Sequence, residues 1–162
     1  MRLFVVLLTL TGYAFAQKDL GRILPADRLI HFVAFGDFGS GSKHQSDVAQ
    51  AIQRRHQQKP FDFGLTLGDN FYRCGVRSAD DSTWQTRWEK YYTPLGIRFY
   101  AALGNHDYGH PAILCPATPV SPQAEVARTE RSKSWSMPAR YYTYTAGPVR
   151  FIAIDTEGWS GA

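Results

Sequence analysis

Three short groups of polar residues carry the chemistry that this sequence could perform. Each group begins with a glycine: Gly36-Asp37, Gly68-Asp69-Asn70 and Gly104-Asn105-His106-Asp107. Carboxylate and amide oxygens are hard donors of the kind that bind Fe(III), Zn(II), Mn(II) or Mg(II). Taken singly, each group is also a common turn sequence. A function therefore depends on whether the three groups meet in space.

The spacing of the groups is typical of a strand–helix–strand repeat. Apolar runs at residues 29–35, 61–67 and 97–103 end just before or at the glycines. Helical patterns fill the intervals, the first capped by Ser42 and the second beginning at Ser82. Parallel strands joined by right-handed crossovers place their carboxyl ends along one edge of a sheet. We therefore expect Asp37, Asp69 and Asn105 to converge at that edge.

The remaining patterns extend this prediction of an α/β fold. Trp84, Trp88, Tyr91 and Tyr92 recur at helical spacing and are expected in the core. A short helix is predicted near residues 125–133, and two β runs at 140–145 and 149–154 are separated by a Gly-Pro turn. The second sheet that these runs begin is expected to be incomplete and to leave apolar surface exposed.

The first sixteen residues have the pattern of a secretory signal peptide. Arg2 precedes an apolar run at residues 3–10, and Ala14-Phe15-Ala16 is a typical cleavage sequence. The run is shorter than the roughly 20 residues that span a bilayer. We expect residues 1–16 to be removed, and residues 17–162 to form one partial domain that is secreted or periplasmic and free of the membrane.

Export changes the interpretation of the two cysteines, because an oxidising compartment allows disulfides to form. The sequence favours a Cys74–Cys115 bridge that ties two loops together, and the alternative is two unpaired thiols. The formal net charge of +4 comes with scattered basic residues, which indicates a solvated surface and no nucleic-acid partner. A mild positive field favours phosphorylated substrates.

In order and residue type, the three groups resemble the first metal motifs of the calcineurin-like metallophosphoesterases. The extension of the second group by Phe71-Tyr72 resembles the purple acid phosphatases in particular. That subfamily lacks a histidine two residues after the first aspartate, and position 39 here is glycine. The resemblance implies a metallophosphoesterase-like layered β-sandwich flanked by helices, with the C-terminal half missing from this chain.

The resemblance also implies a dinuclear metal centre of Fe(III) and a divalent Fe, Zn or Mn ion. Asp37, Asp69 and Tyr72 would bind the ferric ion, with the phenolate giving a purple colour. Asp69 would bridge to the divalent ion, which Asn105 would also bind. The implied activity is hydrolysis of a phosphate ester by a metal-activated hydroxide, at acidic pH.

His106 is expected to act catalytically beside the substrate and to help protonate the leaving group, as the resemblance implies. Asp107 would orient the imidazole of His106. The alternative for His106 is a structural role, as a histidine in a turn that hydrogen-bonds to the backbone.

The chain departs from the family pattern after Asp107, where His110 is the only remaining histidine. The family uses three further histidines, so we expect a truncated fragment that is inactive or nearly so. A second hypothesis is a non-catalytic, secreted metal- or phosphate-binding module, or a nonfunctional remnant. A third, a disulfide-stabilised interaction domain, leaves the three ordered motifs unexplained. The physiological substrate and the oligomeric state are open.

Overall fold

A computed structural model describes residues 18–110, 115 and 120–157 of the protein. The expected signal peptide lies outside the described residues. Among those that are described, no helix combines the length and the apolar character needed to cross a bilayer.

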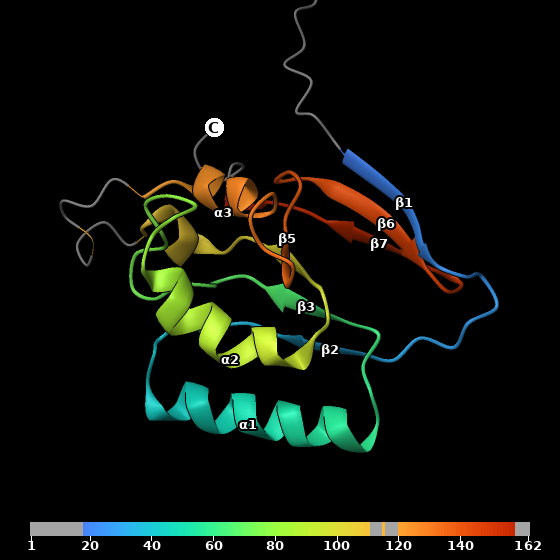
Figure 1. The fold of residues 1–162 in the computed structure, drawn as a ribbon. Helices are drawn as coiled ribbons and strands as arrows, with labels where there is room; N and C mark the ends of the chain where they lie inside the picture. Colours follow the sequence, from blue (N-terminus) through green and yellow to red (C-terminus); the bar gives the residue numbers. More distant parts are fainter. Residues whose placement is uncertain (1–17, 111–114, 116–119, 158–162) are drawn as a thin grey trace, which may run out of the picture.

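The first sheet is the parallel one that the sequence predicts (Figure 1). All its neighbouring strands run parallel, and their order is β2-β3-β4-β5. All three of its crossovers contain helices in the described part of the chain. The strands are β2 (Phe32–Phe35), β3 (Phe63–Leu67), β4 (Phe99–Ala102) and β5 (Trp135–Ser136).

Helices cover one side of this sheet. Helix α1 (Lys43–Gln58) connects β2 to β3, and the side chain of Ser42 caps it as predicted. Between β3 and β4 the sequence predicts one helix, whereas the structure has three consecutive short turns. These are the π-helical η1 (Gln85–Glu89), α2 (Lys90–Tyr92) and the 3-10 turn η2 (Thr93–Leu95).

A second sheet of order β1-β6-β7 packs beside the first (Figure 1). The predicted hairpin is present as β6 (Tyr142–Ala146) and β7 (Val149–Ala153), which pair antiparallel. Strand β1 (Lys18–Leu24) pairs parallel to β6 and was not predicted. Its partner is more than 100 residues away, and its own pattern of exposed residues gives no apolar alternation.

Two short helices follow β4. The 3-10 turn η3 (Asn105–Tyr108) contains most of the third polar group. Helix α3 spans Pro122–Arg128, so the predicted range of 125–133 was wrong at both ends. The Ser121 side chain accepts a hydrogen bond from the Gln123 amide, 3.2 Å away, and a proline occupies the first turn. Both features start the helix earlier than its apolar pattern indicates.

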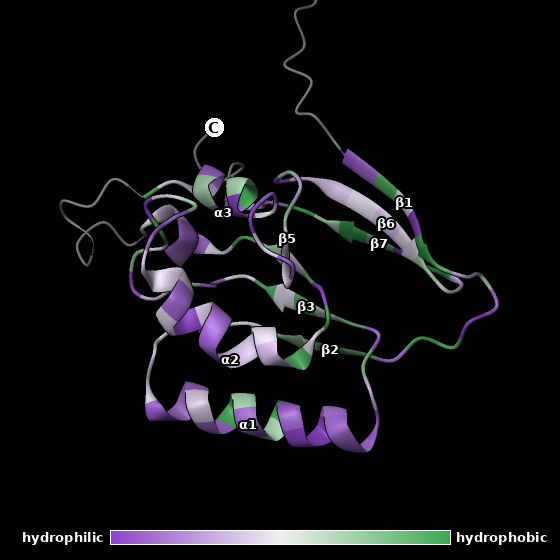
Figure 2. Ribbon diagram, in the orientation of Figure 1, coloured by the Kyte–Doolittle hydropathy of each residue, from purple (hydrophilic) through white to green (hydrophobic). Residues whose placement is uncertain are grey.

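The core lies between the first sheet and its helices and is built largely of aromatic rings. As predicted, Trp84, Trp88 and Tyr92 are fully buried and Tyr91 nearly so. The rings of Trp84 and Trp88 both meet Trp135 of β5, with centroids 5.0 and 4.8 Å apart. The outer helix α1 is mostly hydrophilic (Figure 2) and buries only Gln45 and Ala49.

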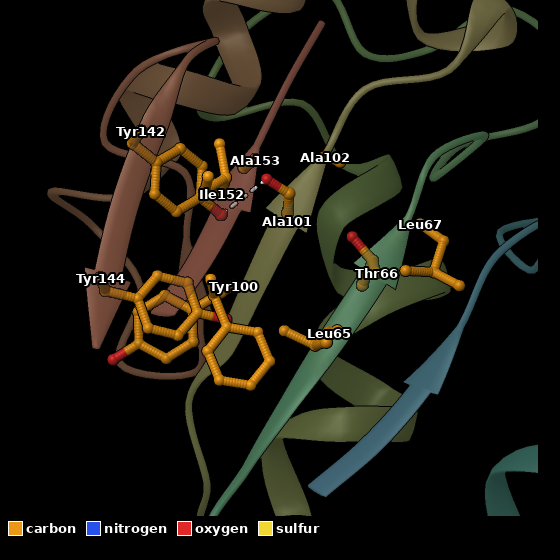
Figure 3. A pocket seen from close by; sticks show the side chains of 11 residues that line it. Leu65, Thr66, Leu67, Tyr100, Ala101, Ala102, Tyr142, Tyr144, Ile152 and Ala153 are labelled. Carbon is orange, nitrogen blue, oxygen red and sulfur yellow. Dashed lines mark hydrogen bonds between the residues drawn. The ribbon is translucent and has the colours of Figure 1, made fainter. Parts of the chain in front are cut away.

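A small apolar cavity of about 100 Å³ lies between the two sheets and is lined by residues of both. Figure 3 shows Tyr100 of the first sheet and Tyr144 of the second, whose rings stack with centroids 4.2 Å apart. The Tyr142 hydroxyl donates to the Ala101 carbonyl at 2.8 Å and joins the sheets. Leu67 and Ile152, which line the same cavity, are 62% and 66% exposed. The expected exposed apolar surface is therefore present.

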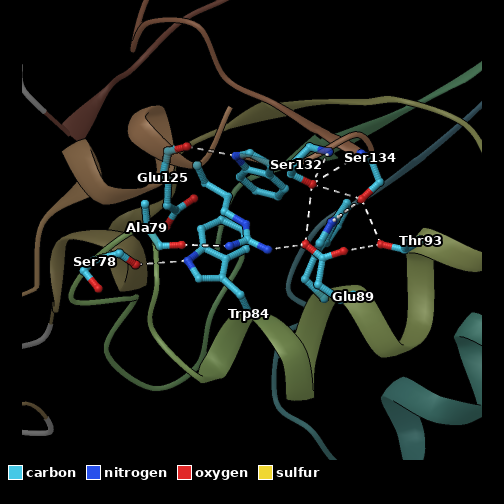
Figure 4. A network of polar contacts seen from close by, with 11 residues as sticks. Ser78, Ala79, Trp84, Glu89, Thr93, Glu125, Ser132 and Ser134 are labelled. Atoms are coloured by element: carbon cyan, nitrogen blue, oxygen red, sulfur yellow. Dashed lines mark hydrogen bonds and ion pairs between the residues drawn. The ribbon is translucent and has the colours of Figure 1, made fainter. Parts of the chain in front are cut away.

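A polar network fastens α3 to the helices under the sheet (Figure 4). The Arg128 guanidinium lies 2.7 Å from Glu89, donates to the Ala79 carbonyl at 2.8 Å and stands over the Trp84 ring. Both charged side chains are largely buried. A buried pair of this kind is costly to break, because the remaining charge is left without a partner.

We expect Arg128→Ala to lower the free energy of unfolding by about 3 kcal/mol, because it leaves the Glu89 carboxylate buried and unpaired. Arg131→Ala is the matched control. Arg131 pairs with Asp80 at the exposed surface, where solvent screens the charges, so its loss is expected to have a much smaller effect. Urea denaturation of the two variants measures both values, and equal losses would contradict the role of the buried pair.

Candidate metal centre

The first two polar groups meet at the carboxyl edge of the parallel sheet, as predicted. Asp37 follows β2 and Asp69 follows β3, and the Asp37 amide donates to the Gly68 carbonyl at 3.2 Å. Both aspartates have left-handed backbone conformations, with φ of 55° and 51°. Such conformations cost about 1–2 kcal/mol for a residue other than glycine and are concentrated at functional sites.

The Tyr72 hydroxyl lies between the two carboxylates. It is 2.7 Å from Asp37 Oδ1 and 3.0 Å from Asp69 Oδ2. Burial, the hydrogen bonds to both carboxylates and their negative charge raise the pKa of Tyr72 far above its usual value of 10. One phenolic proton serves two acceptors here, so the three oxygens form a site of strong negative potential.

The loops that carry these oxygens touch backbone to backbone. A Cβ atom at Gly39 would lie 1.8 Å from the Asn70 carbonyl oxygen, and one at Gly104 would lie 2.4 Å from Asp69 Oδ1. The Tyr72 amide donates to the Gly39 carbonyl at 3.0 Å. Only glycine fits at positions 39 and 104 without displacing the ligand loops.

A backbone hydrogen bond connects the third polar group to the site. The His106 amide donates to Asp69 Oδ1 at 3.0 Å, which places Asn105 beside the second aspartate. The Asn105 side-chain nitrogen donates to the His110 carbonyl at 3.2 Å. Its amide oxygen is the remaining donor atom that it can offer to a cation.

The His106 imidazole is fixed next to Tyr72. Its Nδ1 lies 2.6 Å from the Arg73 carbonyl, and its ring centroid is 4.4 Å from that of Tyr72. A carbonyl oxygen only accepts hydrogen bonds, so Nδ1 carries a proton. The other ring nitrogen, Nε2, is then the atom that can take up or release a proton.

Asp107 has a different role from the one that the sequence predicts. Its carboxylate is fully buried and accepts hydrogen bonds from the amides of Asn70, Phe71 and Gly104 at 2.9–3.2 Å. The imidazole of His106 is held by the Arg73 carbonyl instead. Asp107 therefore joins the second and third ligand loops and does not orient the imidazole. Burial raises its pKa to about 6, although these hydrogen bonds oppose the shift.

Glu125, which was not predicted as a site residue, completes this buried cluster. Its carboxyl group is fully buried, hydrogen-bonds to Asp107, and accepts from the Asn70 side chain at 3.1 Å. Burial, together with the charge of Asp107, raises the pKa of Glu125 well above its usual value. Two buried carboxyl groups in contact share one proton, and we assign it to Glu125 because Asp107 accepts the amide hydrogen bonds. An acidic residue in the first turn of a helix normally indicates only capping.

The residues present fit a cation at the strand ends. Asp37, Asp69 and Tyr72 supply three converging oxygens, and bound positive charge would relieve the repulsion among them. In the described part of the chain, no three His, Cys, Asp or Glu side chains group together as metal ligands. The candidate site depends instead on a phenol and an amide in addition to two carboxylates.

Cys74 and Cys115 form the disulfide that the sequence favours. It ties the segment after Tyr72 to the segment after η3. Gly75 packs against the Asp107 backbone on the same side, where a Cβ atom would lie 2.8 Å from the carbonyl oxygen. The disulfide and the packing of Gly75 therefore both constrain the segment that follows Tyr72.

Comparisons with known proteins point to one family. Residues 30–157 match the family model of the calcineurin-like phosphoesterases. Purple acid phosphatase 7 of Arabidopsis thaliana is 28% identical over 82% of this chain and 38% of its own length. Tartrate-resistant acid phosphatase type 5 of Mus musculus is 32% identical over 70% of this chain and 34% of its own length. The chain thus spans little more than a third of these relatives.

A solved structure shares the fold. It is described as GAP50, the anchor in the inner membrane complex of Plasmodium, and superposes with a TM-score of 0.60 at 21% identity. The match covers 82% of this chain and 44% of that one. At this identity the likeness concerns the fold alone.

We expect Glu125→Gln to change how stability depends on pH. The folded-state pKa of Glu125 lies above the unfolded value of 4.5, so its favourable contribution is complete below that pH and is lost as the pH rises through the folded pKa. Glutamine keeps the hydrogen-bonding groups but does not titrate. The variant should therefore gain stability relative to the parent chain as the pH rises above 4.5 in urea denaturation. Exposed Glu130 is the control, and an identical pH slope for Glu125→Gln and Glu130→Gln would refute the assignment.

We also expect Gly39→Ala to lower the free energy of unfolding by about 3 kcal/mol or more, because the added Cβ overlaps the Asn70 carbonyl. Gly21→Ala is the matched control. Gly21 has open space around its Cβ position and a φ of 68°, so it should show only the conformational cost of about 1 kcal/mol. Thermal and urea unfolding of both variants provide the comparison, and a mild Gly39→Ala would mean that the loops are not in contact.

Proposed function

Because the chain belongs to the calcineurin-like phosphoesterase family, we propose that it contributes one half of a two-metal site that hydrolyses phosphate esters. The observation that supports this proposal most directly is the Tyr72 phenol between two carboxylates. Relatives named as acid phosphatases favour activity at acidic pH. The substrate class is that of phosphomonoesters.

Each ligand has a separate place in this proposal. Asp37, Asp69 and Tyr72 would hold a ferric ion, and Asp69 with Asn105 would hold a divalent Fe, Zn or Mn ion. When bound, the two cations would lower the pKa of a water molecule and offset negative charge on the phosphoryl oxygens. The hydrogen bond from the His106 amide fixes the orientation of the Asp69 carboxylate, which would hold both cations.

His106 is the group proposed to handle the leaving oxygen. Its Nδ1 is committed to the Arg73 carbonyl, so a proton gained by the ring resides on Nε2. Donation from Nε2 to the leaving oxygen would make alcohol departure easier. The contact with the Tyr72 ring holds the imidazole beside the ligand oxygens.

The four proposed ligands are divided unequally between the two cations. Two carboxylates and a phenolate suit a ferric ion, whereas Asp69 and Asn105 alone are few for a divalent ion. We therefore propose that the 162-residue chain binds ferric iron but turns over phosphate esters slowly or not at all. Activity is expected from the product of the complete reading frame if that product supplies imidazole ligands. Extracytoplasmic function is compatible with the disulfide.

We expect Tyr72→Phe to abolish the visible absorption of the iron-loaded chain, because the phenolate that gives the band is removed. Ferric iron should also bind more weakly, since one of three ligands is lost. The control is Tyr91→Phe, at a buried ring of α2 that has no place in the site. Iron titration followed by absorption and by metal analysis tests both points, and a coloured Tyr72→Phe protein would exclude Tyr72 as a ligand.

The alternative of a non-catalytic binding module makes a different prediction. It expects iron binding with the same colour, but no hydrolysis of p-nitrophenyl phosphate by the product of the complete reading frame. Measurable, metal-dependent hydrolysis that is lost in Asp69→Asn would decide for the enzyme.

A further inference from the structure

A polar cluster lies at the open end of the β6–β7 hairpin, where β6 begins and β7 ends. Asp155 follows β7 and is fully buried, and the Nε atom of Arg140, which precedes β6, lies 3.3 Å from Asp155 Oδ2. The Tyr141 hydroxyl donates to the Asp155 carbonyl at 3.0 Å, and the Glu157 amide donates to Asp155 Oδ1 at 3.2 Å. The hairpin and the residues that flank it therefore fix both the carboxyl group and the backbone of Asp155.

Tyr108, the last residue of η3, connects this cluster to the third polar group. The Tyr108 hydroxyl donates to Asp155 Oδ2 at 2.5 Å, and the Arg140 guanidinium stands over the Tyr108 ring, 5.9 Å from its centroid. Burial and the hydrogen bond to Asp155 raise the pKa of Tyr108, so the hydroxyl keeps its proton and stays the donor. A residue 47 positions later in the chain therefore holds one end of the turn that contains Asn105 and His106.

The orientation of η3 depends on such tertiary contacts. A 3-10 turn of four residues has few hydrogen bonds of its own. Asp107 joins the turn to the loop that follows β3, and the neighbouring Tyr108 joins it to the end of β7 in the second sheet. One attachment would leave the turn free to rotate about it, whereas two attachments on adjacent residues fix its orientation. The proposed function assigns no role to the second of these attachments.

We propose that Tyr108 and Asp155 are positioning residues for the third polar group, so that the second sheet determines where Asn105 and His106 lie relative to Asp69. Neither Tyr108 nor Asp155 is proposed to touch a metal ion or the substrate. They act through η3, whose backbone donates from the His106 amide to Asp69 Oδ1 at 3.0 Å.

The consequence for metal binding rests on the proposed function, in which Asn105 binds the divalent ion. The three proposed ferric ligands meet at the Tyr72 hydroxyl, whereas Asn105 is held through η3 and the hairpin. Loss of the Tyr108 hydrogen bond is therefore expected to weaken the divalent site and to leave the ferric site intact.

Hydrogen exchange of backbone amides in the metal-free chain tests the positioning role without any metal. The His106 amide reports on η3, and the Asp37 amide, which donates to the Gly68 carbonyl at 3.2 Å, reports on the ferric side. In Tyr108→Phe the His106 amide should exchange about fivefold to tenfold faster, the effect of one lost hydrogen bond on a local opening. The Asp37 amide should keep its rate. A loss of overall stability would instead accelerate both amides or neither.

Matched controls remove the same groups elsewhere. Tyr144→Phe is the control for the hydroxyl, because Tyr144 lies on β6 and its hydroxyl has no hydrogen-bond partner in the described part of the chain. Asp62→Ala is the control for Asp155→Ala. Asp62 precedes β3, pairs with Arg28 and accepts from the His31 amide at 2.8 Å. Neither control should change the exchange rates of the two reporter amides.

The two substitutions at the contact should not be additive, because they remove the same hydrogen bond. Tyr108→Phe combined with Asp155→Ala should accelerate His106 exchange no more than Asp155→Ala alone. Tyr108→Phe removes a single oxygen atom, so it tests the proposal even if Asp155→Ala does not fold. An unchanged His106 rate in Tyr108→Phe, or equal acceleration of His106 and Asp37, would overturn the proposal.

Zinc binding to the iron-loaded product of the complete reading frame tests the consequence for the divalent ion. Tyr108→Phe should bind zinc about fivefold to tenfold more weakly and keep its iron content and its visible absorption. An equal loss of iron and zinc would contradict a selective effect on the divalent site.

The two levels of inference fail in different ways. If iron does not bind, but His106 exchange in the metal-free chain depends on Tyr108, the proposed function is wrong and the positioning role stands. If the product of the complete reading frame hydrolyses p-nitrophenyl phosphate, but Tyr108→Phe changes neither the His106 exchange rate nor the zinc affinity, the positioning role is wrong and the proposed function stands.

Discussion

One buried carboxylate, that of Asp107, holds the candidate site together. Its oxygens accept hydrogen bonds from the loop that follows β3 and from the loop that follows β4. Those loops contain Asp69 and Asn105, so the relative position of two proposed ligands depends on this single group. Glu125 supports it by carrying the proton that the pair can share. A second buried negative charge would repel the first, so the neutral state of Glu125 is as important as its position.

The proposed ligand oxygens differ from the Asp107–Glu125 pair, because they bring negative charges together and no shared proton neutralises one of them. The parallel sheet delivers Asp37 and Asp69 to neighbouring strand ends, and Tyr72 joins them through its hydroxyl. The glycines at positions 39 and 104 allow the backbones to approach closely enough for this convergence. The fold thus places two carboxylates and a phenol oxygen together, and a bound cation would balance the negative charge of the carboxylates.

The parts of the structure that could be predicted are those encoded by local patterns. Strands β2, β3 and β4, the Ser42 cap and the buried aromatics follow from apolar runs and helical spacing, which the structure confirms. Strand β1 has no such signal, because it is stabilised by pairing with the distant β6. Glu125 was missed for a similar reason. Its surroundings are created by a tertiary contact with Asn70, which no sequence spacing reveals. The roles of Asp37, Asp69, Tyr72 and Asn105 as ligands stay predictions.

The order of the polar groups along the chain has a consequence for how the site is assembled during synthesis. Each proposed ligand follows the strand that positions it, and all four lie within one continuous stretch from Asp37 to Asn105. Neighbouring strands β2, β3 and β4 pair in the order in which they leave the ribosome. Because all four precede residue 106, the loops that carry them are present in the chain before Cys115 and Glu125 have been added. The Asp107–Glu125 contact and the Cys74–Cys115 bridge can therefore form only after the four proposed ligands have been synthesised.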